Sequence, residues 1–211
     1  MERLRLLQAG AGDVLCLAVD GSPDRDRWAG RAGSPDTPVL TDAGWDALID
    51  VLHEIADAAA IGGHPVVFHP HAATFVETPD EIDRLMASSD PARLGLCLDV
   101  GHHIVGGGDP VEATRAVSDR VRHMHLKDVD PAVLQRVRAG EYASLGEAVR
   151  EGLFTELGAG VLDLDGVLAL LAARDYAGWI MVEQDSSWLP PAEASLVSKR
   201  VVEFALRELG G

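Results

Sequence analysis

Short apolar runs alternate along this chain with longer stretches in which apolar residues recur every three or four positions. The short runs have the length and composition of buried strands, and the longer stretches have the spacing of amphipathic helices. Strands are predicted in this way at residues 14–19, 65–71, 94–99, 121–127 and 179–185. Because a helix follows each strand, the pattern predicts an α/β fold with a parallel sheet.

Capping residues and prolines mark the ends of the predicted helices. Thr78-Pro79-Asp80-Glu81 is a capping box with proline at the first helical position. The other expected helices lie between Thr41-Asp42 and Gly62-Gly63, from Asp109-Pro110, over residues 163–174, from Pro190-Pro191 and, ending before the first strand, over residues 3–9.

Residues 130–157 interrupt this rhythm with one or two amphipathic helical pieces, which we interpret as an insertion above the strand ends. The 211 residues, 47% of them hydrophobic, are enough for one sizeable core and show no shift in composition that would indicate two domains. A closed barrel of alternating strands and helices needs eight units and about 250 residues. We therefore expect a single domain, residues 1–211, that is an open sheet or an incomplete barrel of the TIM (β/α)8 type with about five β/α units.

Four of the predicted strands end in residues that bind metals or transfer protons. Because the carboxyl ends of parallel strands meet at one edge, these side chains are expected to form one site. Histidine and carboxylate ligands supplied singly from successive strands suit Mn, Co, Fe or Zn. The predicted ligands are Asp99, His125 and Glu183, each at an equivalent strand end.

The net charge and the cysteines limit which binding partners and which cellular compartment are expected. The formal net charge is −16, which would repel nucleic acid and anionic lipid. No apolar run approaches the roughly 18 residues of a membrane span, and no export signal is evident. The cysteines, Cys16 and Cys97, lie in apolar strand-like runs, where we expect small core residues, so a reducing cytoplasm is predicted.

The strand-end motifs resemble those of the xylose isomerase-like TIM-barrel superfamily. Within it they are similar to the sugar phosphate isomerase/epimerases, and most closely to the inosose dehydratase-like branch. The resemblance covers nearly the whole chain. The motifs that carry it are Leu98-Asp99-Val100-Gly101-His102, His123-Met124-His125-Leu126-Lys127-Asp128, Val182-Glu183-Gln184-Asp185 and the segment from His69-Pro70-His71 to Glu77-Thr78.

The resemblance implies a ligand set and the roles of several neighbouring residues. Asp99, His125 and Glu183 match three metal ligands of the superfamily, and His102 matches a histidine that contacts substrate. The fourth ligand is usually a glutamate inside the strand that here reads Val66-Val67-Phe68, which contains no acid. Glu77, His69 and His71 are the alternatives for that position, and Glu77 is slightly preferred.

The resemblance also implies a divalent-metal-dependent isomerase, epimerase or dehydratase that acts on a sugar or polyol ketone. The metal, Mn, Co, Zn or Mg, would stabilise an enediolate formed when a base removes a proton next to a carbonyl. His102, or whichever of His69 and His71 is not a ligand, is the expected base or acid. Lys127 is expected either to bind a substrate oxyanion or to pair with Asp128.

Barrels of this superfamily carry about three further β/α units before the strand that matches residues 14–19. We therefore expect an N-terminally truncated barrel whose sheet has two open edges. A homo-oligomer or a complementing chain would close it. The alternative to an enzyme is accordingly a non-catalytic or partner-dependent barrel remnant, while an apurinic-site endonuclease is disfavoured by the net charge.

Overall fold

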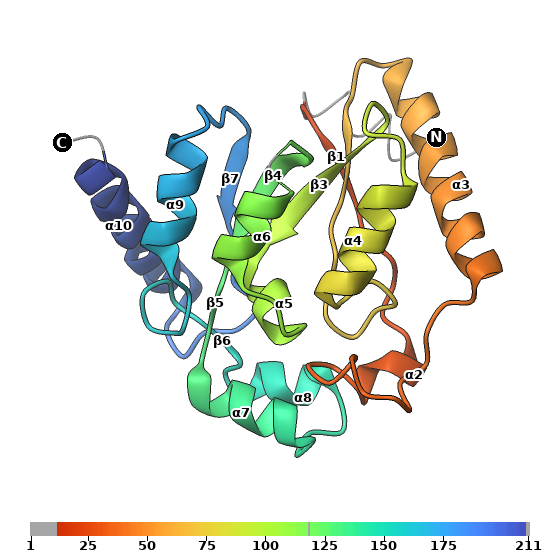
Figure 1. The fold of residues 1–211 in the computed structure, drawn as a ribbon. Helices are drawn as coiled ribbons and strands as arrows, with labels where there is room; N and C mark the ends of the chain where they lie inside the picture. Colours follow the sequence, from red (N-terminus) through yellow and green to blue (C-terminus); the bar gives the residue numbers. More distant parts are fainter. Residues whose placement is uncertain (1–11, 118, 210–211) are drawn as a thin grey trace.

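A computed structural model describes residues 12–117 and 119–209 of the chain. Its main sheet has five parallel strands in the order β1-β2-β3-β4-β7, and a two-stranded antiparallel sheet pairs β5 with β6 (Figure 1). The strands are β1 Leu15–Leu17, β2 Val66–Phe68, β3 Leu94–Asp99, β4 Val121–Leu126, β5 Asp128–Val129, β6 Phe154–Thr155 and β7 Trp179–Val182. The helices are α2 Pro23–Asp26, α3 Asp42–Ala60, α4 Pro79–Ser88, α5 Val100–Val105, α6 Pro110–Ala116, α7 Pro131–Ala139, α8 Leu145–Arg150, α9 Leu164–Ala172 and α10 Pro191–Leu209.

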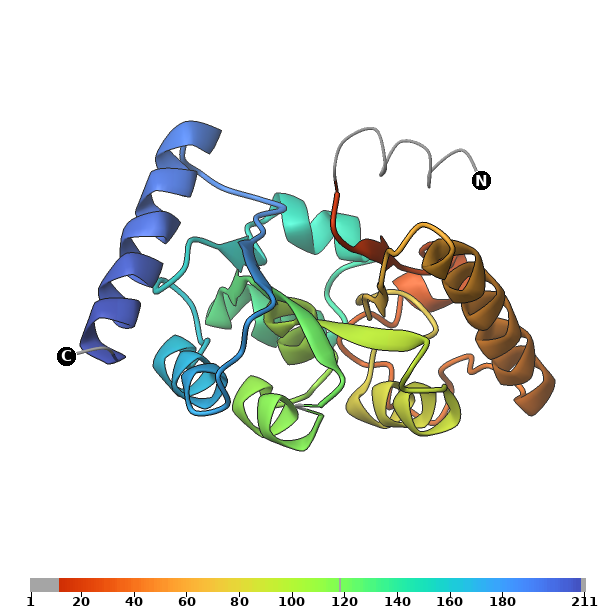
Figure 2. The same ribbon diagram turned by 90° about the horizontal axis from the view of Figure 1, so that it is seen from above.

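The predicted α/β fold of incomplete TIM-barrel type is confirmed, with one strand in each of the five predicted segments. Viewed from above, the helices that follow these strands form an arc along one side of the curved sheet (Figure 2). The sheet ends at β1 on one side and at β7 on the other, so it has the shape of half a barrel. The helix expected over residues 3–9 lies outside the described residues.

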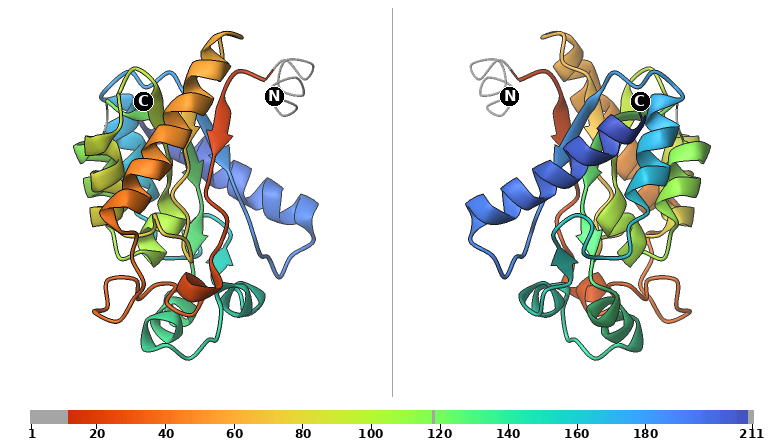
Figure 3. Two further views of the ribbon diagram at one scale, coloured as in Figure 1. Left: turned by 90° about the vertical axis from the view of Figure 1, so that its right-hand side faces the viewer. Right: turned by 90° about the vertical axis from the view of Figure 1, so that its left-hand side faces the viewer.

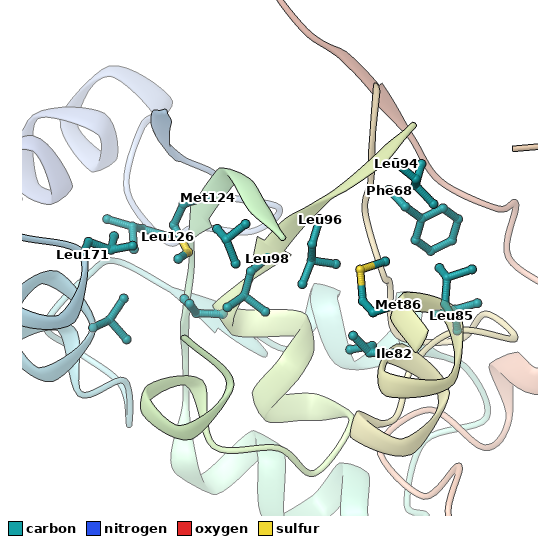
Figure 4. Close-up of a cluster of buried hydrophobic side chains, with 14 of the residues drawn as sticks. Phe68, Ile82, Leu85, Met86, Leu94, Leu96, Leu98, Met124, Leu126 and Leu171 are labelled. Atoms are coloured by element: carbon teal, nitrogen blue, oxygen red, sulfur yellow. The ribbon is translucent and has the colours of Figure 1, made fainter. Parts of the chain in front are cut away.

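The main core lies between the sheet and its helices (Figure 4). Leu94, Leu96 and Leu98 of β3 belong to it, together with Met124 and Leu126 of β4. Because side chains alternate along a strand, the residues between these leucines face the opposite, concave side of the sheet. The same alternation along β3 and β4 therefore directs a second set of side chains to the concave side, and this set includes Cys97, Asp99 and His125.

The predicted insertion above the strand ends is present. Helices α7 and α8 and the β5–β6 pair lie beyond the carboxyl ends of the main strands, on the same end as α2 (Figure 3). The buried carboxylate of Asp128 holds this part in place, because it accepts hydrogen bonds from the backbone amides of Gly158, Gly160 and Leu162. Asp128 is thus turned towards a loop, and the pairing of Asp128 with Lys127 that we considered is not formed.

The concave face of the sheet is uncovered at its edges, where Trp179 and Met181 of β7 are 57% and 50% exposed. Cys97 is buried, as expected, but Cys16 is exposed, and its predicted place in the core is wrong. An apolar run does not specify whether its strand is central or at an edge, and β1 is an edge strand. No helix within the described parts of the chain is long and apolar enough to span a membrane.

The loop after β1 is anchored by a buried ion pair. Arg25 is fully buried, and its guanidinium donates two hydrogen bonds to the carboxylate of Glu81, at 2.8 and 3.0 Å, and one to the carbonyl of Pro38. The same carboxylate closes the capping box of α4. This arrangement joins the long loop that follows β1 to the helix that follows β2.

Replacing Arg25 by methionine is expected to lower the free energy of unfolding by about 3–5 kcal/mol, because the buried carboxylate of Glu81 loses its counter-charge. Urea denaturation followed by circular dichroism measures the effect. The matched control is Arg93→Met, which breaks an exposed pair with Asp57 and should cost less than about 1 kcal/mol. Equal losses in the two variants would contradict the buried anchor.

Candidate metal centre

Four neighbouring strands deliver one ligand-type side chain each to the same end of the sheet. Asp99 is the last residue of β3, His125 lies opposite it in the register of β4, His69 follows β2 directly, and Glu183 follows β7 directly. The strands are parallel and adjacent, so residues at equivalent ends come together. The structure thus brings together the three predicted ligands and adds His69.

The potential ligand atoms of these four residues all lie within 4.8 Å of one another. Nδ1 of His125 is 3.0 Å from Oε2 of Glu183 and 3.6 Å from Oδ2 of Asp99. Nε2 of His69 is 3.5 Å from the same Asp99 oxygen and 3.8 Å from the same Glu183 oxygen. Ligands about 2.1 Å from one ion are separated by about 3 Å or slightly more, so these atoms could bind a single ion after small adjustments.

The donor atoms also fit a cation because no hydrogen bond occupies three of them. Within the described residues, Oδ2 of Asp99, Oε2 of Glu183 and Nδ1 of His125 are buried and make no hydrogen bond. The second oxygen of Asp99, Oδ1, caps α5 by accepting from the amide of His102 at 2.8 Å. Leaving a buried polar atom without a partner is costly, and a divalent cation bound here would satisfy all three.

Without an ion, the charges in the cluster compensate one another. Burial disfavours a charged His69, but the carboxylates of Asp99 and Glu183 beside it outweigh this effect and raise the pKa of His69 to about 10. The pKa of His125 is raised to about 9 by the same carboxylates, again against burial. The pKa of Glu183 is lowered by its contacts with the two imidazoles. An entering cation must therefore displace protons from the imidazoles.

Glu77, the preferred fourth ligand from the sequence, lies outside this group of ligand atoms. Its carboxylate accepts hydrogen bonds from the backbone amides of Gly30 at 2.8 Å and Ala73 at 2.7 Å, and the side chain is buried. Ala73 has a positive φ of 68°, so Glu77 supports a strained turn. The structure therefore places His69, one of the alternatives, beside Asp99, His125 and Glu183, and it places Glu77 apart from them.

Replacing Glu77 by alanine is expected to destabilise the fold without changing the number of divalent ions bound. Each amide left buried without an acceptor costs about 1–3 kcal/mol. Burial raises the pKa of Glu77 to about 7, so the folded chain binds this proton more tightly than the unfolded chain does. In the wild type, this group should make stability fall as pH rises from about 4.5 to 7, and the variant should lack that contribution. Urea titrations at several pH values and Mn²⁺ titration measure both effects.

The exposed carboxylate of Glu112 provides the control, because Glu112→Ala should change neither stability nor ion binding appreciably. A folded Glu77→Ala protein that binds no Mn²⁺ would show that Glu77 is a ligand after all.

A second group of side chains lies directly beside the ligand cluster. The ammonium of Lys127 is 3.3 Å from Oδ2 of Asp99 and 3.0 Å from Oε2 of Glu183, and it donates to Asp185 at 2.8 Å. It also lies 3.1 Å from Nε2 of His102. Although burial works against the charge, the carboxylates of Asp99, Asp185 and Glu183 raise the pKa of Lys127. Lys127 is therefore a buried cation at this site.

His71 and His102 stack on each other, with ring centroids 3.6 Å apart. Burial lowers the pKa of both imidazoles, so both are neutral near pH 7. Nδ1 of His71 lies 2.7 Å from the carbonyl oxygen of Ala72, and a carbonyl only accepts. That nitrogen therefore carries the proton, and Nε2 of His71 is left as a base.

A cavity of about 490 Å³ opens next to His71. Its wall includes the polar residues Asp20, Ser22 and Asp26 from the loop after β1 and Thr74 from the turn after β2. The volume is within the range of small-molecule sites, and the lining has the hydrogen-bonding groups that a hydroxylated ligand needs.

Sequence analysis did not single out Asp185 or Cys97 as site residues. Asp185 accepts a hydrogen bond from Lys127. Its position two residues after Glu183 could have indicated in the sequence that it lies at the site. The ligand atom of Cys97 lies within 4.8 Å of those of His69 and His125. The two-residue spacing between Cys97 and Asp99 could have indicated that Cys97 lies at the site, since residues two apart on a strand share a face.

A family model described as xylose isomerase-like TIM barrel matches residues 12–203. Inosose dehydratase from Geobacillus kaustophilus (strain HTA426) is 41% identical over 172 residues, which are 81% of this chain and 56% of that protein. Inosose dehydratase from Bacillus cereus (strain AH820) is 37% identical over 168 residues, 79% of this chain and 56% of the relative. The chain thus spans little more than half the length of these relatives.

Solved structures share the fold at low sequence identity. The IOLI protein with a bound zinc atom superposes with a TM-score of 0.68 at 16% identity, over 99% of this chain and 68% of that one. A D-tagatose 3-epimerase-like protein has a TM-score of 0.68 at 17% identity, over 99% of this chain and 67% of that one. These likenesses establish the barrel-type fold.

Proposed function

This chain belongs to the xylose isomerase-like TIM barrel family, and on that premise we propose that it is part of a divalent-metal-dependent dehydratase of the inosose dehydratase type. The observation that carries the proposal is the convergence of His69, Asp99, His125 and Glu183 beside a buried lysine and two neutral histidines. The sequence identity of 40% to an inosose dehydratase favours dehydration over isomerisation and epimerisation. The substrate class is a polyol ketone.

The four clustered residues would hold the ion, with His69 in place of Glu77. A bound divalent ion would polarise the substrate carbonyl and make the neighbouring C–H bond more acidic. The hydrogen bond of the His71 ring uses Nδ1 and leaves Nε2 without the proton. Nε2 of His71 can therefore accept the proton from that carbon. His102, packed against His71, fixes the position of that ring.

Loss of water also needs a proton for the departing hydroxyl group. The ammonium of Lys127 is a donor beside the ligand cluster, and Asp185 holds it there at 2.8 Å. Overall, one C–H proton goes to His71 and a carbon–carbon double bond forms. The hydroxyl group takes a proton from Lys127 and leaves as water. His71, His102 and Lys127 retain the roles in substrate binding or proton transfer that the sequence suggested.

The proposal is tested with protein stripped of metal by a chelator and reloaded separately with Mn²⁺, Co²⁺, Zn²⁺ or Mg²⁺. Incubation with 2-keto-myo-inositol, followed by NMR, should show loss of the proton next to the carbonyl together with loss of water. Ketohexoses serve as the comparison, since exchange or inversion without water loss would assign an isomerase or epimerase instead. Protein that binds none of these ions would overturn the whole assignment.

A partner-dependent form of the same activity is the second candidate, favoured by the exposed apolar side chains near β7. Trp179 and Met181 of β7 and Phe204 of α10, which is 61% exposed, lie at one side of the half-barrel. Burial of such surface stabilises association by about 25 cal/mol per Å². Light scattering is expected to show self-association or poor solubility of this chain alone, with activity restored by a complementing chain. A stable monomer with full turnover would exclude this candidate.

A further inference from the structure

Two thiols lie on the concave side of the sheet, next to the carboxylate-containing centre. Cys97 precedes Asp99 by two residues on β3, and it pairs in register with His123 of β4. Cys16 is exposed and lies on β1, which is separated from β3 by β2. The proposed dehydration uses neither cysteine.

The thiol of Cys97 already converges with two imidazoles. The ligand atoms of His69, Cys97 and His125 lie within 4.8 Å of one another, and all three residues are buried. In the carboxylate centre, His69 approaches the acids through Nε2. Its other nitrogen, Nδ1, is buried and has no hydrogen-bond partner within the described residues. The imidazole of His69 therefore has a second nitrogen without an assigned role.

The two thiols are not placed to form a disulfide. Strand β2 lies between β1 and β3, and Cys16 is level with Val67 and Gly95, two residues before Cys97. Two strand spacings separate their backbones by about 9–10 Å. A disulfide requires Cα atoms about 4.4–6.8 Å apart. The thiol of Cys97 therefore stays available as a ligand.

We propose that Cys97, together with His69 and His125, forms a second ion position that takes a thiophilic divalent ion of the zinc class. Zinc-class ions bind thiolate and imidazole together, and sites with three protein ligands keep a fourth position open. The carboxylate centre lacks thiolate and also suits harder ions such as Mn²⁺. The two positions share their histidines, so thiophilic ions are drawn towards Cys97 and hard ions towards Asp99 and Glu183.

Titration of metal-free, reduced protein with Co²⁺ alone tests the proposal. Thiolate bound to Co²⁺ should produce a charge-transfer absorption in the near ultraviolet, which oxygen and nitrogen ligands do not produce. Cys97→Ser should abolish this absorption, whereas the matched control Cys16→Ser should retain it, since Cys97 supplies the thiolate. Asp99→Asn should retain it, because the carboxylate is not part of the thiolate position.

Mn²⁺ binding separates this proposal from the proposed function. Cys97→Ser should bind Mn²⁺ as the wild type does, which also shows that the variant is folded. Absence of the absorption from wild-type protein, or its loss in Asp99→Asn but not in Cys97→Ser, would overturn the thiolate position. A wild-type mass two hydrogens short of the reduced chain, with no free thiol, would overturn it as well by demonstrating a disulfide.

Discussion

Asp99→Asn is expected to weaken Mn²⁺ binding at least about 100-fold and to reduce any metal-dependent turnover in proportion at limiting metal. The physical reason is that Oδ2 of Asp99 is a buried oxygen that lies 3.5 Å from His69 and 3.6 Å from His125. Asparagine replaces a charged ligand by a neutral amide. Isothermal titration with Mn²⁺ measures the change in affinity.

This substitution separates ligand chemistry from helix capping. The other oxygen of Asp99 accepts from the amide of His102, and the asparagine carbonyl can do the same. Asp99→Ala removes the cap as well and should lower the free energy of unfolding by a further ~0.5–2 kcal/mol. The control is Asp109→Asn at the cap of α6, which should bind Mn²⁺ normally. Undiminished affinity in Asp99→Asn would exclude Asp99 as a ligand.

Lys127→Met is expected to reduce turnover by about 10²- to 10⁴-fold while metal affinity stays the same or rises. Methionine retains much of the buried stem, but it removes the ammonium that lies 3.0 Å from Glu183 and 2.8 Å from Asp185. The proton for the departing hydroxyl is then missing. Because a cation no longer lies beside the ligand oxygens, a divalent ion meets less repulsion.

The same variant has a stability signature that depends on metal. Without an ion, the carboxylates around residue 127 lose their cation, and the unfolding free energy should fall by about 3–5 kcal/mol. Added Mn²⁺ should restore more stability to Lys127→Met than it adds to the wild type, since bound ligand stabilises the folded state. Thermal melts with and without Mn²⁺ measure this difference. Lys199→Met, at an exposed pair with Glu203, is the control, and wild-type turnover in Lys127→Met would rule out its catalytic role.

The site was predictable as far as its residues follow the strand period. Asp99, His125 and Glu183 stand at equivalent ends of three predicted strands, and parallel strands bring equivalent ends together. The choice between Glu77 and His69 was not predictable, because the direction of a side chain after a strand end depends on the turn that follows. Here the turn presents the amides of Gly30 and Ala73 to Glu77, and those amides hold its carboxylate away from the cluster.

Neighbouring polar residues were equally ambiguous in the sequence. Lys127 and Asp128 are adjacent and of opposite charge, which suggests a local pair. The structure turns Asp128 towards the amides of residues 158–162 and Lys127 towards Asp185. Both partners are distant in the sequence, at 58 positions for Asp185 and 30 to 34 positions for the amides that bind Asp128. Only contacts between distant segments decide such a choice.

By itself, the sequence determined the alternation of strands and helices, the helix caps, the insertion at residues 130–157 and the polar residues that end each strand. These features depend on local periods and capping chemistry, which the chain carries in any context. The tertiary structure decided the place of His69 in the cluster, the buried charge of Lys127, the exposure of Cys16 and the approach of Cys97 to His69 and His125. Those properties depend on which strands become neighbours and which strand lies at an edge, because distance, burial and charge are set by residues that are far apart in the chain.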